Sequence, residues 1–196
     1  MRVSTKGVSA AVAIAAMSLT GVPVTAQAIG PGLLYTVILP AGEFGSNNYT
    51  EVMTSKIAAA QKFCADIDND SYNVDCLAER LGEISDEMPK GSDYDEVKSL
   101  LKDTSDQLSE LARANRDVNQ PRGRATSKGE NPVTTSRPLT PVTKESLPQV
   151  NAKAQAILEN TETLLLRSAE GSESKVLQYS RIADALGSSK VLLRSA

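Results

Sequence analysis

Beyond residue 50, apolar side chains recur at alternating steps of four and three residues along five stretches of the chain. That spacing is typical of helices that pack lengthwise on one another, whereas a half-buried strand alternates every second residue. We therefore predict an all-α fold, an antiparallel helical bundle with coiled-coil-like seams. The five stripes are Met53, Ile57, Ala60, Cys64 and Ile67; Val74, Leu77, Leu81, Ile84 and Met88; Val97, Leu101, Thr104, Leu108, Leu111 and Asn115; Val150, Ala154, Ile157, Thr161 and Leu164; and Val176, Tyr179, Ala183, Leu186, Lys190 and Leu193.

Turn and capping residues separate these stripes. Residues 89–91, Pro-Lys-Gly, interrupt the pattern between the second and third stripes, and Gly171 interrupts it between the fourth and fifth. Breaks this short predict antiparallel helical hairpins. Residues 187–189, Gly-Ser-Ser, are a place where the last helix could end early. Three capping boxes are expected at helix starts, namely Asn48 with Glu51, Ser92 with Asp95, and Ser146 with Gln149.

The stretch between the third and fourth stripes is the least suited to a packed core. Residues 118–144 contain four prolines, two glycines, seven serines or threonines and only four large aliphatic residues. Residues 113–144 carry seven basic and two acidic side chains, a net charge of +5. The segment is longer than a normal connection within a domain, and its composition does not support a packed core, so we interpret residues 118–145 as a disordered, basic, proline-rich linker. The alternative is a segment that docks on an anionic membrane surface or an acidic partner, including the chain's own acidic residues 51–110. The linker separates a three-helix unit at 48–117 from a C-terminal helical hairpin at 146–196.

The N-terminal part of the chain has a different pattern. Arg2 and Lys6 precede an apolar run, and residues 26–28, Ala-Gln-Ala, supply the small-x-small pattern that a signal peptidase recognises. The run is shorter than the ~20 residues that cross a bilayer. Residues 1–28 are therefore predicted to be a cleaved signal peptide, which leaves no integral membrane span. Residues 29–47 are an apolar N-terminal arm, whose segment at 33–39 could be a short strand, an arm packed on the bundle or a partner-binding tail.

The chain has two cysteines, Cys64 and Cys76, at the end of the first stripe and near the start of the second. An even number of cysteines in an exported chain is typical of a disulfide, whereas in the cytosol a metal or redox site would come first. We predict that the two cysteines are joined. The bond would staple the three-helix unit and contribute roughly 3 kcal/mol on the chain-entropy model.

Composition and charge narrow the possible chemistry. The chain has no histidine, which excludes Ser-His and Cys-His catalytic pairs and histidine-containing zinc sites. The net charge is −3, and residues 51–110 alone carry −9, which argues against nucleic acid as a partner. Carboxylates one helical turn apart, such as Glu79 and Glu83 or Asp103 and Asp106, are interpreted as hydrated helix faces. We expect no enzyme activity, no catalytic residues and no cofactor.

The strongest metal-like motif lies between the two cysteines. Residues 66–75 read Asp-Ile-Asp-Asn-Asp-Ser-Tyr-Asn-Val-Asp, with aspartates at alternate positions as in calcium loops. Ser71 stands where such a loop needs glycine, and Leu77 stands where it needs a bidentate glutamate. We interpret the stretch as an exposed turn between helices and assign no metal site.

Together these features predict an exported protein, periplasmic or secreted, with a non-enzymatic interaction or scaffolding role. A two-helix hairpin buries little apolar surface alone, so the hairpin at 146–196 should pack on the first unit, on a second copy or on another protein. The expected partner is thus a protein or the chain itself, bound through helices. The alternative is a small-ligand or ion-binding helical protein of the cell envelope, using residues 66–75 or an apolar cavity between helices.

Overall fold

The computed structural model describes residues 47–91 and 94–194 and confirms the predicted all-α fold. Within these ranges the chain forms five α-helices and a short 3-10 helix, with isolated β-bridges in place of strands. The predicted signal peptide at 1–28 lies outside the described residues, as does all of the N-terminal arm except residue 47. The elements are α1 (Asn47–Ala65), η1 (Asp70–Tyr72), α2 (Asn73–Glu87), α3 (Asp95–Ala114), α4 (Leu147–Ser168) and α5 (Glu173–Arg194).

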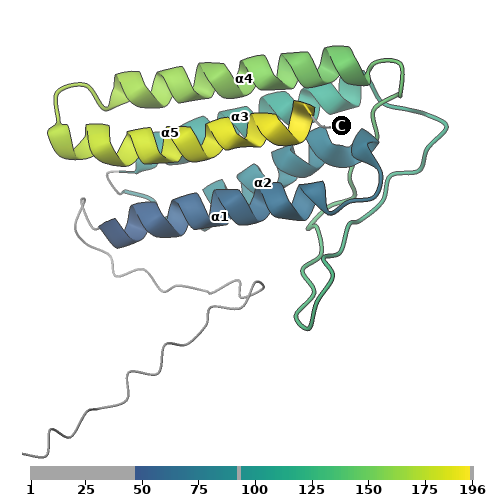
Figure 1. Ribbon diagram of the computed structural model, residues 1–196, viewed down its shortest axis with the longest axis horizontal. Helices are drawn as coiled ribbons and strands as arrows, with labels where there is room; N and C mark the ends of the chain where they lie inside the picture. Colours follow the sequence, from purple (N-terminus) through teal and green to yellow (C-terminus); the bar gives the residue numbers. More distant parts are fainter. Residues whose placement is uncertain (1–46, 92–93, 195–196) are drawn as a thin grey trace, which may run out of the picture. The chain divides into compact units, whose positions relative to one another are not determined.

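The five helices form a closed ring, in which each helix packs on the next one in the chain and α5 packs back on α1 (Figure 1). Neighbouring helices run antiparallel, except α1 and α5, which run parallel. Near the start of both helices, the Tyr94 hydroxyl donates to Gln178 of α5 (2.6 Å) and lies 3.3 Å from the hydroxyl of Thr50 in α1. Further along, Gln61 of α1 donates to the hydroxyl of Ser189 in α5 (2.8 Å).

The predicted stripes form most of the core, with a shift in α4. All five positions of the second stripe are buried, from Val74 in α2 to Met88 just after it, whereas in α4 the buried residues include Leu158 and Leu165 in place of the predicted Ile157 and Leu164. Because α4 packs between α3 and α5, its buried face is broader than a two-helix seam and follows the period of a straight helix. The first position of the fifth stripe, Val176, is also exposed rather than buried.

Two polar residues of the predicted seams, Thr104 and Thr161, contact each other between α3 and α4. Both are buried, and their hydroxyl oxygens lie 2.7 Å apart. Each hydroxyl also has the carbonyl four residues earlier within hydrogen-bond distance. The pair is therefore a satisfied polar contact that matches the register of the two helices. Asn115 has a different role, because it follows the last residue of α3 and donates to the carbonyl of Leu111 (2.8 Å).

Glycines explain where the helices end and why α5 continues. Gly91 and Gly171 have positive φ angles of 73° and 93°, as the predicted breaks require. Gly187, in contrast, lies inside α5. A Cβ atom at this position would come within 3.3 Å of the Glu162 carboxylate on α4, so the glycine allows close packing of the two helices rather than a helix end.

The predicted capping box at Ser146 marks the start of a helix, but its side chain does not form the predicted hydrogen bond. Ser146 precedes α4 but makes no side-chain capping hydrogen bond, and its hydroxyl accepts from Thr143 instead (2.8 Å). Tyr94, rather than Ser92, is the residue before α3. The side chains of Asn48 and Ser92 lie outside the described part of the structure.

The C-terminal hairpin of α4 and α5 packs on the first three helices. One continuous hydrophobic core contains buried residues from all five helices, including Leu101 of α3, Leu158 of α4 and Ile182 of α5. The sequence left open whether the hairpin packs on the first unit, on a second copy or on another protein. In the structure it packs on the first unit of its own chain. Within the described ranges, none of the helices has the length and apolar character needed to cross a membrane.

Candidate functional site

The connection between α3 and α4, residues 115–146, differs most from the sequence prediction. Its two ends lie side by side, because the N–H of Thr143 donates to the carbonyl of Asn115 (3.0 Å). Helix-to-helix connections in bundles usually need about 2–8 residues, so most of this segment is not required for the turn. It contains isolated antiparallel β-bridges but no helix and no regular sheet, and it is not the free tether expected for residues 118–145. Thr135, Leu139, Thr140 and Val142 are buried.

Within the connection, residues 123–139 fold back on themselves as a two-stranded ribbon, which projects beyond the end of α1 in Figure 1. Gly123 and Leu139 exchange two backbone hydrogen bonds (3.3 and 2.7 Å), and Thr135 donates to the carbonyl of Ala125 (2.9 Å). Gly123 and Ala125 are two residues apart on the first strand, whereas their partners Leu139 and Thr135 are four residues apart on the second. The second strand therefore contains a bulge at 136–138, which redirects the chain locally.

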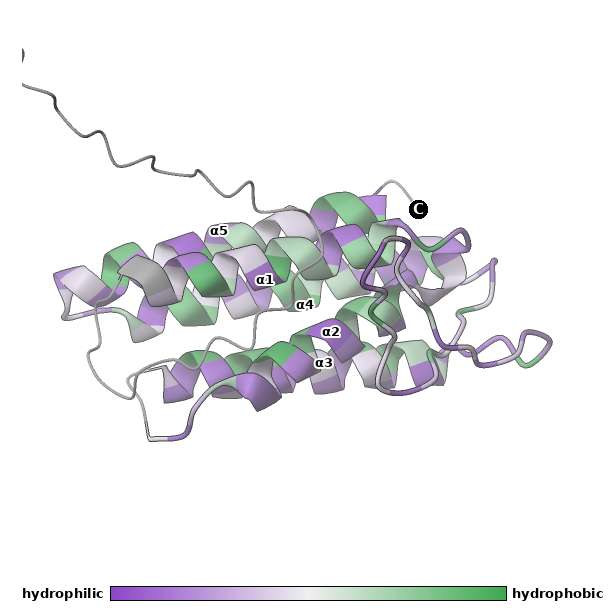
Figure 2. Ribbon diagram, turned by 90° about the horizontal axis from the view of Figure 1, so that it is seen from below, coloured by the Kyte–Doolittle hydropathy of each residue, from purple (hydrophilic) through white to green (hydrophobic). Residues whose placement is uncertain are grey.

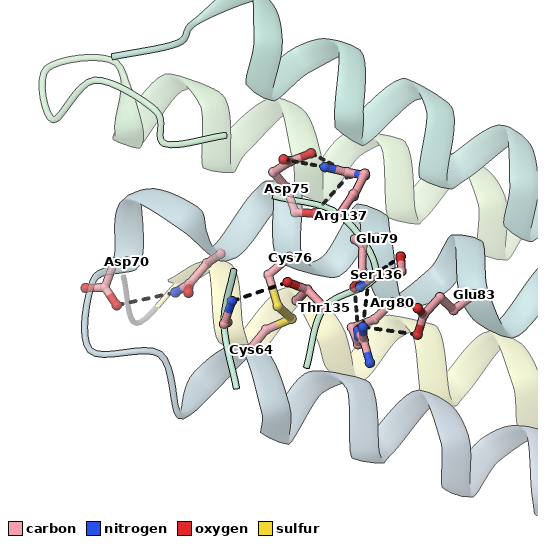
Figure 3. Close-up of a disulfide and its surroundings, with 12 residues drawn as sticks. Cys64, Asp70, Asp75, Cys76, Glu79, Arg80, Glu83, Thr135, Ser136 and Arg137 are labelled. Carbon is pink, nitrogen blue, oxygen red and sulfur yellow. Dashed lines mark hydrogen bonds and ion pairs between the residues drawn. A yellow bond between two sulfur atoms is a disulfide. The ribbon is translucent and has the colours of Figure 1, made fainter. Parts of the chain in front are cut away.

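The bulge brings Arg137 to Asp75, a residue in the first turn of α2 (Figure 3). Asp75 is fully buried, and both its carboxylate oxygens accept from the Arg137 guanidinium at 2.7 Å. The backbone N–H of Thr140 (2.6 Å) and the hydroxyl of Ser109 (3.2 Å) also donate to the carboxylate. Hydrogen bonding to Asp75 raises the pKa of Arg137 above its ordinary value. A buried charge with this many partners is satisfied in the folded state.

One turn further along α2, Glu79 holds the residue before Arg137. Its carboxylate accepts from the backbone N–H of Ser136 (2.6 Å) and from the Ser136 hydroxyl (2.8 Å), and it pairs with the neighbouring Arg80 (2.5 and 2.7 Å). Burial alone would raise the pKa of Glu79, but these hydrogen bonds and the Arg80 charge outweigh it and lower the pKa. We call Asp75 and Glu79, with their contacts to residues 136–140, the carboxylate clamp.

Arg80 lies between the buried carboxylate of Glu79 and the partly exposed carboxylate of Glu83. Its guanidinium lies 3.0 Å from the Glu83 carboxylate and 4.8 Å from the centre of the Phe63 ring on α1. Burial and the nearby Glu79 charge together outweigh the attraction of Arg80, so the pKa of Glu83 is raised. Glu79 and Glu83 were interpreted from the sequence as one hydrated face. The structure corrects this for Glu79, which the connection covers, while Glu83 stays half-buried.

The predicted disulfide joins the end of α1 to the start of α2 directly beneath the connection. The Cα atoms of Cys64 and Cys76 are 5.8 Å apart, within the usual range for a bridge. Both cysteines are fully buried in a small cluster with Leu139 and with Ala125 of the ribbon. The staple and the carboxylate clamp therefore hold the connection on the same part of α2.

The aspartates of residues 66–75 do not gather into a metal site. Asp66 and Asp68 are exposed, and Asp70 accepts from the Asn73 side chain (3.3 Å), while Asp75 points into the carboxylate clamp. In the part of the chain that the structure describes, no three Asp, Glu, Cys or His side chains come close enough to hold a metal ion. The turn instead contacts the connection, since Tyr72 donates to the carbonyl of Pro121 (2.7 Å).

An open polar pocket of about 190 Å³ lies beside the clamp, between α2 and α3. Its walls include Glu83 and Asp86 on one helix and Lys102, Asp106 and Arg113 on the other, together with Ser136 and Arg137 of the connection. Most of these charges already have partners within the protein, such as Lys102 with Asp106 at 2.5 Å. The pocket therefore offers a polar surface without a convergent set of free ligand groups.

Comparison with known proteins adds no assignment, because no protein-family model, no curated protein and no solved structure matches this chain. The candidate site consequently rests on the geometry of the connection. Sequence reasoning identified Cys64 and Cys76 but missed the carboxylate clamp. The signal that could have found it is the basic residue Arg137 beside the apolar stretch 139–142, inside a segment otherwise poor in apolar residues.

Proposed function

We propose that this protein is an exported, non-enzymatic interaction module, in which the helical bundle holds the connection at 115–146 as a binding surface. The observation that carries the proposal is the carboxylate clamp. Burying the carboxylates of Asp75 and Glu79 has a large desolvation cost. Ion pairs and hydrogen bonds, including those from Ser136, Arg137 and Thr140, offset that cost. A short turn would join α3 to α4 without the clamp, so its structural effect is to fix the conformation of a long loop.

A rigid scaffold that positions a long surface loop is typical of binding proteins. The polar groups nearest the pocket support binding rather than catalysis, since Asp75 and Glu79 are committed to ion pairs and backbone hydrogen bonds. Export is part of the proposal, and it is supported by the signal-like residues 1–28 and by a disulfide, which persists best outside the cytosol.

Site-specific photo-crosslinking in the cells that make the protein tests the binding surface. A photoreactive amino acid at Thr126 or Lys128 should give adducts of a defined larger mass, whereas the same group at Asp184, on the exposed face of α5, should not. Adducts from Asp184 with none from the ribbon would place the interaction on the helices and overturn the proposal. Intact-mass measurement of the exported form tests the signal peptide, with Ile29 expected as the first residue.

A further inference from the structure

We propose that the open edge of the ribbon, residues 122–128, binds an extended acidic peptide segment of a partner protein by adding it as a third strand. This inference rests on the proposed function and names the chemistry of the partner. It follows from two observations on the ribbon: its two edges differ in free backbone hydrogen-bond donors, and the open edge carries exposed cations at three of four alternate positions.

The edge formed by residues 132–138 is closed to a further strand. Pro132 and Pro138 have no N–H group, and the N–H of Ser136 already donates to Glu79. At residues 122–128 the situation is reversed. The backbone N–H and C=O groups of Ala125 and Ser127 face the second strand. Because these groups alternate in direction along a strand, the backbone groups of Thr126 and Lys128 face outward. Within the described residues, the backbone N–H groups of Arg124, Thr126 and Lys128 have no hydrogen-bond partner, although the Arg124 guanidinium donates to the carbonyl of Thr135 (2.9 Å).

The side chains along the open edge alternate strictly. Arg122, Arg124, Thr126 and Lys128 are exposed, whereas the residues between them are partly buried toward the bundle. In an extended chain these four side chains share one face. The negative partners nearby are weak, since the exposed Asp68 lies 3.7 Å from Lys128. A strand with acidic residues at every second position would place carboxylates beside Arg122, Arg124 and Lys128.

Charge alone would also attract an anionic membrane surface. The outward N–H groups favour a peptide, because they repeat every two residues, about 7 Å, which is the spacing of carbonyl groups on one side of an extended strand. A lipid surface offers no such row of acceptors. Charge and backbone geometry thus select the same partner class.

Binding of a blocked Glu-Thr-Glu-Thr-Glu-Thr-Glu peptide to the mature full chain tests the inference. Hydrogen exchange followed by NMR should show the amides of Arg124, Thr126 and Lys128 slowed by about tenfold or more at saturation. The same peptide with alternate backbone nitrogens methylated keeps its charge but loses the strand hydrogen bonds. It should bind at least about tenfold more weakly, because the loss of two or more hydrogen bonds of about 1 kcal/mol each changes Kd by more than a factor of ten.

A matched pair of proline variants separates the two edges. Thr126 and Thr134 face each other across the ribbon and their hydroxyls lie 2.9 Å apart, so replacing either one removes the same side-chain contact. Thr126→Pro removes a donor from the open edge and should weaken peptide binding about tenfold. Thr134→Pro lies on the closed edge and should leave binding unchanged. Circular dichroism melting of both variants checks that the bundle remains folded.

Three results would overturn strand addition. The first is equal binding of the methylated and unmethylated peptides, and the second is an equal effect of Thr126→Pro and Thr134→Pro. The third is binding of phosphatidylglycerol vesicles without binding of the peptide. In each case, photo-crosslinks from the ribbon would still support the proposed function, whereas their absence would remove that function independently of the peptide result.

Discussion

The seam between α3 and α4 and the contact between α2 and residues 135–142 are both buried, yet different forces hold them. In the seam, apolar side chains such as Leu101, Leu108 and Leu165 pack in the common core, with the Thr104–Thr161 pair as a polar contact. At the α2 contact the carboxylate clamp dominates (Figure 3). Burial of apolar area contributes gradually and tolerates small changes, whereas a buried ion pair is stable only while its partners are present.

The two regions also differ in their sequence signal, although their partners lie similarly far apart in the sequence. Thr104 and Thr161 of the seam are 57 residues apart, and Asp75 and Arg137 are 62 residues apart. In Figure 2, hydrophobic and hydrophilic residues alternate repeatedly along each helix. A helical stripe repeats its signal every few residues, but a single ion pair gives no repeat. The difference explains why one region could be predicted and the other could not.

The largest expected effect is from Asp75→Ala. The substitution leaves the Arg137 guanidinium half-buried without its carboxylate and the N–H of Thr140 without its acceptor. Removing one member of a buried pair typically costs about 3–5 kcal/mol, so we expect a loss of this size in urea unfolding followed by circular dichroism. The matched control is Asp68→Ala, whose exposed partner is Lys128 and which should leave the midpoint unchanged. Equal effects of the two variants would mean that the clamp does not hold the connection.

Next in size is the effect of removing the disulfide. Replacing Cys64 and Cys76 together by alanine releases a short loop and should lower the free energy of unfolding by roughly 3 kcal/mol. Unfolding of the unmodified protein in a reductant supplies the control, because it should approach the stability of the double variant. A loss well under 1 kcal/mol would show that Leu139 and the clamp hold this end of α2 without the staple.

The sequence predicts the helical part of the fold because its signals are local and repeated. The stripes of α1 to α3 and the cysteine pair agree with the structure except near the stripe ends, where Ile67, Leu111 and Asn115 are only partly buried. The errors in α4, such as Ile157 for Leu158, are shifts of one residue. They arise because the pattern contains no information on how many neighbours α4 has. Capping boxes performed less well, since Ser146 satisfies the motif but its hydroxyl pairs with Thr143.

The candidate site was not predictable in the same way. From α2 alone, Glu79, Arg80 and Glu83 have the appearance of a solvated face opposite the apolar stripe. A segment more than 50 residues later covers that face, so the burial of Glu79 depends on residues 135–140 and not on its own neighbours. Composition was misleading for the same reason. Prolines and few aliphatic residues predict disorder when apolar burial alone is expected to order a segment. Here the carboxylates of Asp75 and Glu79 also bind the segment, beside the buried Leu139 and Val142.

A smaller and more specific test uses the opposite pKa shifts of Glu79 and Glu83. The lowered pKa of Glu79 means that its ionised form stabilises the fold above its ordinary value of 4.5, and this contribution is lost as pH falls through the folded pKa. The raised pKa of Glu83 has the reverse sign: its contribution is present at low pH and is lost as pH rises through the folded pKa.

At pH 7, Glu79→Gln should therefore destabilise the protein by about 2 kcal/mol, the value of one lost hydrogen bond to a charged group. Glu83→Gln should stabilise it by at most a few tenths of a kcal/mol, roughly, because that side chain is partly screened by water. Both differences should shrink in urea unfolding at about pH 3.5, where the carboxyls of the unfolded chain are largely protonated. Effects of the same sign at pH 7 would show that the two carboxylates share one environment, contrary to the structure.

The smallest effect concerns proteolysis of the connection. Lys128, at the exposed tip next to Gly129, should be the first trypsin site, whereas Arg124 should be cut about tenfold more slowly because the ribbon pairs Ala125 with Thr135. Arg137 is a poor reporter, since the following Pro138 resists trypsin. Asp75→Ala should bring the two rates together by freeing the ribbon.

After the cut, the fragments should elute together from a sizing column, because α4 packs on α3 and α5 packs on α1. Separation of the fragments would mean that the hairpin does not share the core with the first three helices, and equal cutting of Lys128 and Arg124 in the unmodified protein would mean that the ribbon is not fixed in solution.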